Sequence, residues 1–389
     1  MDSKITIREL CEKKIATTTP NFSDKINYID IASVDNQKKK IVSMQLMEYS
    51  EAPSRARQIV QYNDVLVSTV RPNLNAIAIV NTENEDYPLV ASTGYCVLRC
   101  KPQLNPKYLF YFCQSPAFIT SMASQATGAS YPAVNSSIVR NEEIPFCSTE
   151  MQYRIVAIFE AIDQLISKRH QQLEKLDTLV KSQFIEMFGD PMLNPKNWPV
   201  HQLSEHIKFL TSGSRGWAKY FTDDGEYFIT IKNVKDCRIT LDNMQHITPP
   251  DNAEAKRAKV QTGDLLISIT ADLGRTGVVS EEIAEHGAYI NQHLTCIRLD
   301  QNTLDPLYTA YYMESEAGKS QFESKNQSAV KAGLNFNSIN SLKVMIPPME
   351  LQKSFVRFIE QTDKSKFAIQ QSLDKLETLK KALMQEYFG

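Results

Sequence analysis

The Glu-x-Lys dipeptides at residues 254–256 and 323–325 are the nearest approach to a catalytic pattern in this sequence. They read Glu254-Ala255-Lys256 and Glu323-Ser324-Lys325, and dipeptides of this type occur in nucleases. Asp251 lies too close to the first dipeptide to complete such a site, and the second falls in a segment whose pattern predicts a helix. We therefore interpret both as solvated surface charge.

Other motifs of catalytic or cofactor sites are missing from the sequence. The stretch TSGSRGW (211–217) could cradle a phosphate, but no Lys-Ser or Lys-Thr follows it, so a polar turn is the simpler interpretation. The Asn-Pro-Pro-aromatic tetrapeptide and the Gly-rich cofactor loop of amino-methyltransferases are absent, as are GxxxxGK[ST] and GxSxG. We expect a chain that has no catalytic residues and no cofactor of its own.

Cysteine and histidine usage predicts no metal site. The seven cysteines form no CxxC pair, and their odd number argues against a disulfide framework. The six histidines are scattered, and no HxxxH or H-x-E pattern places two ligands on one face. We expect most of the cysteines to be buried, reduced thiols.

The last seventeen residues repeat a segment from the middle of the chain. Residues 373–389 read LDKLETLKKALMQEYFG and residues 173–189 read LEKLDTLVKSQFIEMFG, an offset of 200 positions. The same offset aligns QYNDVLVS (61–68) with QTGDLLIS (261–268). A two-residue insertion accounts for a slip to 202 at Asn135 and Asn337. The sequence therefore predicts a tandem duplication of a globular segment followed by a long helix.

Each globular segment has the pattern of an α+β domain with a mixed sheet. The runs DVLVSTV (64–70) and DLLISIT (264–270) follow turn residues and predict buried strands. Residues 105–124 and 305–324 each predict one closing helix, followed by a polar loop and an Ile-Pro strand. We place the first globule at residues 1–146 and the second at 191–346.

The two long helices are predicted at residues 147–190 and 347–389. Thr149 and Gln152 have the spacing of a helix start, Gly189-Asp190-Pro191 forms a stop, and Pro347-Pro348 opens the second helix. Because 40 residues outrun the diameter of a 150-residue globule, we expect the two apolar stripes to pair antiparallel as a coiled coil. The predicted interface residues are Ile162, Leu173, Leu176, Ile369, Leu373 and Leu376.

Composition is that of an ordinary soluble protein. The chain has 389 residues, of which 42% are hydrophobic and 23% are charged, and no apolar run could span a bilayer or act as a secretory signal. We expect a cytoplasmic protein. The net charge is only −2, but basic residues gather in the globules as QKKK (37–40), SRAR (54–57) and AKRAK (255–259). A nucleic-acid partner is compatible with this distribution if another subunit supplies further positive surface.

The whole chain resembles the DNA-specificity subunit of type I restriction-modification systems. The order of globule, helix, globule and helix carries this resemblance, together with residues in the two copies that match the family pattern. These are Ile144-Pro145, Gln152 and Leu173 to Gly189 in the first copy, and Ile346-Pro347-Pro348, Glu350, Gln352 and Leu373 to Gly389 in the second. TSGSRGWAKYF (211–221) also looks like the opening of many second target domains.

The resemblance implies a division of labour between subunits. The globules would be target-recognition domains that read a bipartite target in double-stranded DNA, with the coiled coil setting their separation. Two modification subunits would carry the methyltransferase cofactor and catalysis, and restriction subunits would translocate and cleave the DNA. The alternatives are a fused restriction or methylation polypeptide, which the missing motifs disfavour, and a coiled-coil adaptor whose globules bind proteins.

The repeat separates predicted scaffold from predicted base-reading residues. Positions identical in the two copies, such as Asp64 and Asp264, should be scaffold, and Arg57 with Arg257 fits a shared phosphate contact. Polar loop positions that differ have side chains suited to base edges. They are Arg71, Asn73, Asn75, Thr127 and Tyr131 in the first copy, and Ser214, Arg215, Trp217, Lys219, Arg275, His293 and Lys331 in the second.

Overall fold

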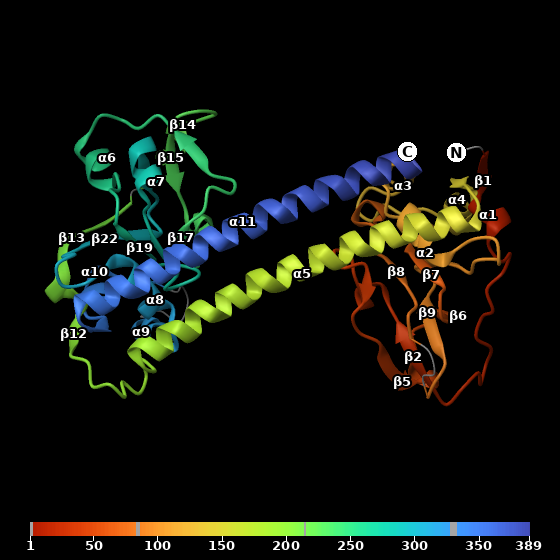
Figure 1. The fold of residues 1–389 in the computed structure, drawn as a ribbon, viewed down its shortest axis with the longest axis horizontal. Helices are drawn as coiled ribbons and strands as arrows, with labels where there is room; N and C mark the ends of the chain where they lie inside the picture. Colours follow the sequence, from red (N-terminus) through yellow and green to blue (C-terminus); the bar gives the residue numbers. More distant parts are fainter. Residues whose placement is uncertain (1–2, 83–85, 214, 327–332) are drawn as a thin grey trace. The chain divides into compact units, whose positions relative to one another are not determined.

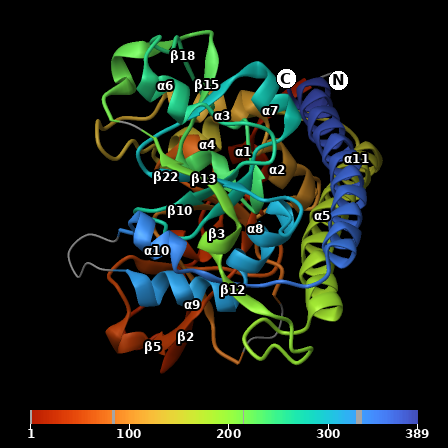
Figure 2. The ribbon, with the colours of Figure 1, turned by 90° about the vertical axis from the view of Figure 1, so that its left-hand side faces the viewer.

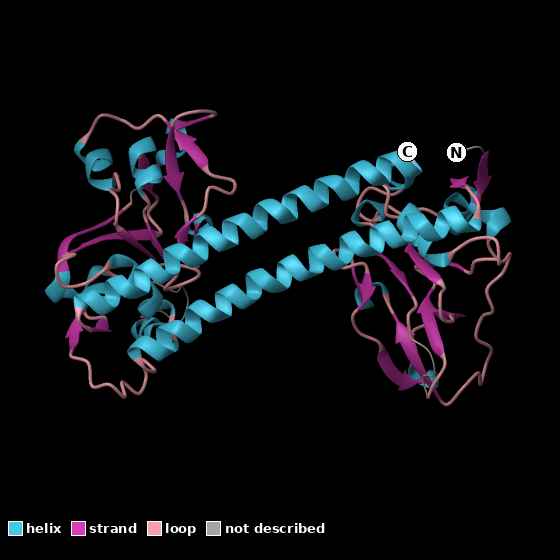
Figure 3. Ribbon diagram, in the orientation of Figure 1, coloured by secondary structure: helices cyan, strands magenta, loops and turns pink. Residues whose placement is uncertain are grey.

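The computed structural model describes residues 3–82, 86–213, 215–326 and 333–389. The chain forms two compact units, and each long helix contributes to both of them. Unit 1 consists of Met1–Gln172 with Ile369–Gly389, and unit 2 consists of Leu173–Ala368. Helices and strands occur together in each unit (Figures 1 and 3), which confirms the predicted α+β class.

Unit 1 contains a four-stranded mixed sheet and a three-stranded antiparallel sheet. The first has the order β5 (Gln45–Glu48), β2 (Lys25–Ile29), β9 (Leu89–Ser92), β6 (Ala56–Ile59), and only β2 and β9 are parallel. The second has the order β10 (Tyr95–Leu98), β7 (Val65–Ser68), β8 (Ile77–Ile79). Two further pairs are β1 (Ser3–Thr6) with β11 (Glu143–Phe146), and β3 (Val34–Asp35) with β4 (Lys40–Ile41). The short helices are α1 (Ile7–Leu10), α2 (Pro106–Phe112), α3 (Pro116–Ser124) and α4 (Ser136–Asn141).

Unit 2 repeats this plan with a larger central sheet. Six strands have the order β13 (Ile207–Ser212), β22 (Leu294–Leu299), β19 (Leu265–Ser268), β20 (Thr276–Val278), β17 (Cys237–Ile239), β16 (Val234–Lys235). A four-stranded mixed sheet has the order β14 (Phe221–Thr222), β18 (Gln245–Ile247), β15 (Glu226–Ile229), β21 (Ala288–Ile290), and β12 (Val200–Gln202) pairs with β23 (Lys343–Met345). The short helices, several of which can be followed in Figure 2, are α6 (Ala253–Ala258), α7 (Glu281–His286), α8 (Pro306–Glu314), α9 (Glu316–Lys325) and α10 (Phe336–Asn340).

A buried ion pair recurs at the same place in both units. The Asp64 carboxylate accepts hydrogen bonds from Arg99 Nε at 2.9 Å and Nη2 at 2.7 Å, and also from the Gln61 backbone N–H at 2.8 Å. Asp264 does the same with Arg298, at 2.8 Å to both nitrogens, and with the Gln261 backbone N–H. Both carboxylates are fully buried at the start of an equivalent strand. This confirms that these repeated aspartates are scaffold.

The prediction of a single closing helix in each globule is wrong, because the structure has two consecutive helices in each of these segments. In unit 1 Ser115 caps α3 by accepting from the Phe118 N–H, and Pro116 has no N–H with which to continue α2. In unit 2 Ser115's counterpart, Ser315, accepts from the Gly318 N–H and starts α9 directly after α8. In unit 2 the capping serine therefore ends one helix and starts the next, whereas in unit 1 α2 has already ended at Phe112, with Cys113 as its C-cap.

The long helices are α5 (Thr149–Phe188) and α11 (Met349–Phe388), each of 40 residues. Thr149 is not the cap of α5, since the preceding Ser148 accepts from the Met151 N–H through its hydroxyl and from the Gln152 N–H through its carbonyl. The predicted stop is confirmed, because Gly189 has a φ of +82° that favours glycine and its N–H closes the last turn on Ile185 O. The predicted division at residues 146, 190 and 346 stays a prediction, since the compact units cut both helices.

The long helices run antiparallel within each unit. In unit 1 Lys380 of α11 forms an ion pair of 2.6 Å with Asp163 of α5, and Phe388 of α11 packs on Phe159 of α5. The residue numbers along α11 therefore increase in the direction in which those along α5 decrease. In unit 2 Lys366 pairs with Asp177, and Phe355 packs on Phe184. The predicted antiparallel pairing is therefore confirmed inside each unit.

The end of each long helix completes the core of a unit. Phe388 of α11 packs against Tyr108 and Phe112 of α2 in unit 1, with ring centroids 5.2 and 5.9 Å away. Phe188 of α5 packs in the same way against Tyr308 of α8 in unit 2, at 4.7 Å. The aromatic-Gly ends of the two repeated segments are therefore anchors, which explains why this sequence is repeated.

Candidate nucleic-acid interface

The two units carry the same exposed loop after equivalent strands. In unit 1 this loop follows β7 and contains Arg71, and in unit 2 it follows β19 and contains Ala271. Both residues adopt a left-handed conformation that is uncommon outside glycine, with φ of 48° and 57°. In each unit the first residue after the strand accepts a backbone hydrogen bond from a second loop, from Val134 N to Thr69 O and from Leu334 N to Ile269 O, both 2.9 Å. The helix that follows is capped by Asn135 in unit 1 and by Asn335 in unit 2, so the offset stays at 200 and the two-residue insertion inferred from the sequence is wrong. The two loops therefore begin alike but close differently, since Ser68 N donates to Ala76 O whereas Ser268 N donates to Arg275 O, one position earlier. Their shared left-handed position holds arginine in unit 1 and alanine in unit 2.

Buried polar contacts of Asn75 hold the unit 1 loop in place. Its single turn of 3₁₀-helix (Pro72–Leu74) ends at Asn75, which is only 7% exposed and donates from Nδ2 to Cys113 O at 2.9 Å. Lys39 Nζ donates to the carbonyl and side-chain oxygens of Asn75, at 2.6 and 2.9 Å. Desolvation, and secondarily the charge of Lys380, lowers the pKa of Lys39 to about 8. Asn75 is therefore a support of this loop, and its side chain is not available to a base.

Arg71 lies over the ring of Tyr131 at the edge of a cavity. The guanidinium carbon is 4.8 Å from the ring centroid, which is cation–π geometry. Arg71 N donates to Pro132 O at 2.7 Å, so the arginine and the tyrosine loops are joined through the backbone. The cavity has a volume of about 310 Å³, and its walls include Val34, Val70 and Leu74. Two predicted site residues of unit 1, Arg71 and Tyr131, therefore line this cavity.

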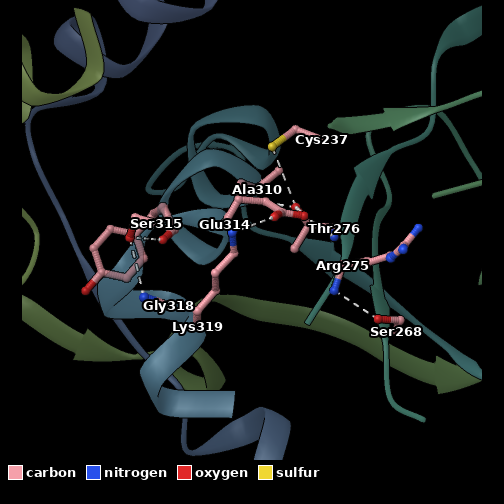
Figure 4. Close-up of polar contacts among 10 residues, drawn as sticks. Cys237, Ser268, Arg275, Thr276, Ala310, Glu314, Ser315, Gly318 and Lys319 are labelled. Atoms are coloured by element: carbon pink, nitrogen blue, oxygen red, sulfur yellow. Dashed lines mark hydrogen bonds and ion pairs between the residues drawn. The ribbon is translucent and has the colours of Figure 1, made fainter. Parts of the chain in front are cut away.

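The unit 2 loop is held by a different network (Figure 4). Arg275 N donates to Ser268 Oγ at 2.9 Å. The Arg275 side chain forms an ion pair of 2.7 Å with Asp272. The next residue, Thr276, donates from its backbone N–H to Glu314 Oε1 at 2.9 Å and from its hydroxyl to Ala310 O at 3.1 Å. Helix α8 thus fixes the strand that carries Arg275, and Asp272 partly neutralises that arginine.

The structure separates the remaining predicted residues of unit 2. His293 is half-buried, and its Nδ1 lies 2.7 Å from Thr270 Oγ1 in the loop that contains Ala271. Trp217 is only 4% exposed and packs on Phe228 and Tyr289, so it is a core residue that does not reach a base. Arg215 and Lys219 flank it and are exposed. Ser214 and Lys331 lie outside the residues that the structure describes.

The predicted pairing of Arg57 with Arg257 joins residues on different elements. Arg57 is exposed on strand β6 and donates to Ser54 O, whereas Arg257 is exposed in the last turn of helix α6. Asn73 and Thr127 are also exposed, in the loop that contains Arg71 and the loop that contains Tyr131.

Of the predicted coiled-coil residues, Ile162 and Leu373 are buried, and Leu173, Leu176, Ile369 and Leu376 are half-buried.

The part of the chain that the structure describes contains neither a metal-binding cluster nor a membrane-spanning helix. Within the described ranges, no three His, Cys, Asp or Glu side chains are grouped so that they could bind a metal ion. Among the same residues, no helix combines the length and apolar character needed to cross a bilayer. The sequence pattern missed one close contact, since His201 Nδ1 lies 3.2 Å from His206 Nε2.

Comparison with known families decides the assignment. The model of the type I restriction modification DNA specificity domain matches twice, at residues 3–176 and 195–381. The chain belongs to this family. The resemblance stated from the sequence is therefore confirmed.

Curated relatives of this specificity family are similar over part of their length. The chain is 23% identical over 244 residues to the EcoBI specificity subunit of Escherichia coli, covering 62% of this chain and 48% of that protein. It is 24% identical over 201 residues to the putative MjaX specificity subunit of Methanocaldococcus jannaschii, covering 50% and 46%. It is 20% identical over 362 residues to the StySPI specificity subunit of Salmonella potsdam, covering 86% and 75%. The matched part thus spans about half the length of the first two relatives.

Solved structures of the specificity family share the fold. A chain from a study of type I R-M complex assembly has a TM-score of 0.67 at 23% identity, with 99% of this chain and 97% of that chain covered. The type I S subunit from M. genitalium has a TM-score of 0.57 at 14% identity, with 100% and 96% covered. At these identities the likeness concerns the fold alone.

Two residues near the candidate interface of this specificity-family chain were not predicted from the sequence. Lys39 supports Asn75 from the hairpin of β3 and β4, and Asn36 lines the cavity from the same hairpin. The basic run QKKK marked this segment, and Lys38 and Lys40 in it are exposed. No sequence signal linked the hairpin to the Arg71 loop, because the link is a tertiary hydrogen bond.

Proposed function

We propose that this chain is the DNA-specificity subunit of a type I restriction-modification complex. In this proposal unit 1 and unit 2 each read one half of a bipartite target in double-stranded DNA. The observation that carries it is the duplicated loop, which begins with the same backbone contact and a left-handed residue in both units and changes that residue from Arg71 to Ala271. A shared frame with different residues is what two readers of dissimilar half-sites require, since phosphate contacts position the protein and base contacts specify the sequence.

The catalytic steps are assigned to partner subunits. Two modification subunits would bind the methyl donor and transfer the methyl group, and restriction subunits would translocate and cleave the DNA. The chain itself would be non-catalytic, which agrees with the missing methyltransferase and nucleotide-binding motifs. Calorimetry on the purified chain should detect no stoichiometric binding of S-adenosylmethionine, and binding at a one-to-one ratio would contradict this assignment.

The long helices offer surface for such partners. Exposed apolar side chains on α5 include Tyr153, Leu165 and Leu179, and Leu379 of α11 is also about half exposed. Large exposed apolar side chains on one element favour a protein interface. We expect Tyr153→Asp to reduce co-purification of modification subunits with the chain, whereas Lys175→Asp, at an exposed polar position, should not.

A domain exchange tests the reading of two half-sites. Residues 191–346 would be replaced by the equivalent segment of a relative with a different target, and the methylated motif would be determined by sequencing genomic DNA from cells that express the subunits. We expect one half-site to change and the other to remain. A motif that changes in both halves, or that is continuous in the parent, would contradict the proposal.

A further inference from the structure

Arg71, Tyr131 and the cavity beside them lie together on the surface of unit 1. Arg71 is exposed, and the structure pairs it with no carboxylate among the described residues, whereas Arg275 in the unit 2 loop is paired with Asp272. Tyr131 is 69% exposed, and its ring lies beside the guanidinium of Arg71 at the edge of the cavity. Both side chains are therefore available to a ligand.

The backbone around this pair is fixed. Thr127 and Ala133 exchange two hydrogen bonds of 2.9 Å, which close the loop that carries Tyr131, and Arg71 N donates to Pro132 O. Below Arg71, Asn75 is tied to Cys113 and Lys39. A left-handed arginine costs backbone energy and persists only where surrounding contacts determine it. The guanidinium is thus presented by a preorganised frame.

The chemistry of the pair selects a ligand. The guanidinium carbon of Arg71 lies 4.8 Å from the ring centroid of Tyr131, and no carboxylate among the described residues pairs with the N–H groups of this arginine. The planar N–H edge of a guanidinium matches the O6 and N7 acceptors of guanine in the major groove with two hydrogen bonds. The apolar walls of the cavity, formed by Val34, Val70 and Leu74, offer contact to the flat or methylated part of a base without competing donors. Exposed Lys38 and Lys40 on the neighbouring hairpin add positive charge for the DNA backbone.

The duplication distinguishes a base contact from a phosphate contact. A phosphate contact that belongs to the shared frame should occur in both units, but the left-handed position holds Arg71 in unit 1 and Ala271 in unit 2. We infer that Arg71, laid over Tyr131, is the guanine-reading residue of unit 1 and determines one base pair of its half-site. This inference rests on the proposed function and deepens it.

The test uses the full chain assembled with its modification subunits and a library of randomised DNA duplexes. Wild-type complex should select a bipartite motif with guanine at one position of the unit 1 half-site. Arg71→Ala should lower the preference for guanine at that position by roughly 10- to 100-fold, with every other position unchanged. Tyr131→Phe should keep the preference, and Tyr131→Ser should weaken it at the same position, because only the ring supports the guanidinium.

Two controls keep the outcomes distinct. Alanine is accepted at this backbone conformation by Ala271, so Arg71→Ala should fold, and Arg71→Gln provides a second variant that keeps the length of the side chain without the guanidinium fork. Lys40→Ala removes one of the exposed lysines assigned to the DNA backbone, so it should leave the motif unchanged and weaken binding to all duplexes with a smaller salt dependence. If Arg71→Ala behaves like Lys40→Ala, or relaxes the other half-site, the guanine assignment is overturned. If the wild-type complex selects no bipartite motif, the proposed function itself fails.

Discussion

The ring of Phe388 on α11 stacks on that of Phe159 on α5 in unit 1, with centroids 5.9 Å apart and planes inclined by 16°. Phe388 is 2% exposed although only Gly389 follows it in this sequence. It lies among Tyr108, Phe112 and Phe159, so the end of a helix that begins after the second globule belongs to the core of the first unit. The final segment is therefore a core element of unit 1.

Removing this ring should destabilise unit 1. Truncation of a buried phenylalanine leaves a cavity, and we expect Phe388→Ala to lower the free energy of unfolding by about 3–5 kcal/mol. Phe367→Ala on the same helix is the matched control, because that ring is 65% exposed and should change stability by less than about 0.5 kcal/mol. Denaturant unfolding of the two variants and the wild type measures both effects, and similar shifts would contradict the packing role.

The buried ion pair that recurs in both units should contribute more to the free energy of unfolding than a pair at the surface. Asp64→Ala leaves Arg99 without its carboxylate partner, so we expect a loss of about 3–5 kcal/mol. Glu48→Ala breaks the half-exposed pair with Lys25 and should cost less than about 1 kcal/mol. Thermal or denaturant unfolding followed by circular dichroism would compare them. A small effect of Asp64→Ala would argue that the pair is not part of the scaffold.

Lys39 gives unit 1 a specific dependence on pH. Its folded pKa of about 8 is below the ordinary value of 10.5, mainly because burial disfavours the charged form. The unfolded chain therefore binds more protons between these values, and stability from this group should increase as pH rises from about 8 towards 10.5. The penalty is fully present below pH 8.

The measurement is the difference between wild type and Lys39→Met in unfolding free energy across this range. Subtracting the variant removes the tyrosines and other lysines that titrate in the same window. Lys40→Met, at an exposed position of the same hairpin, serves as the control and should give a flat difference. A flat difference for Lys39→Met as well would show that burial does not shift this amine.

The apolar stripe of the long helices should tolerate charge poorly. Leu373 is buried on α11, and placing a carboxylate there forfeits roughly 1.5 to 3 kcal/mol of burial and adds an unpaired charge. Lys375 is exposed two residues further on, so Lys375→Asp should have little effect. We expect Leu373→Asp to lower the thermal midpoint clearly more than Lys375→Asp, and equal shifts would refute the pairing of the stripes.

The duplication, the long helices and the scaffold positions could all be predicted from the amino-acid sequence. An offset of 200 residues and a leucine spacing of three and four are properties of the chain that need no coordinates. Buried positions such as Asp64 and Asp264 are constrained by packing in the same way in both copies, so identity between copies identified them. The family follows from the same order of elements.

Which polar loop residues are buried and which are exposed could be seen only in the folded chain. Asn75 and Trp217 have side chains that suit base contacts, yet both are buried, because Asn75 bonds to Cys113 and Trp217 packs on Phe228. Arg71 has the same kind of sequence context but stands free over Tyr131, 60 positions further along the chain. Whether a loop side chain points inward or outward depends on backbone dihedral angles and on contacts with distant segments. No local sequence pattern encodes those contacts, so only the folded chain distinguishes the supports of the loop from the residues that it presents.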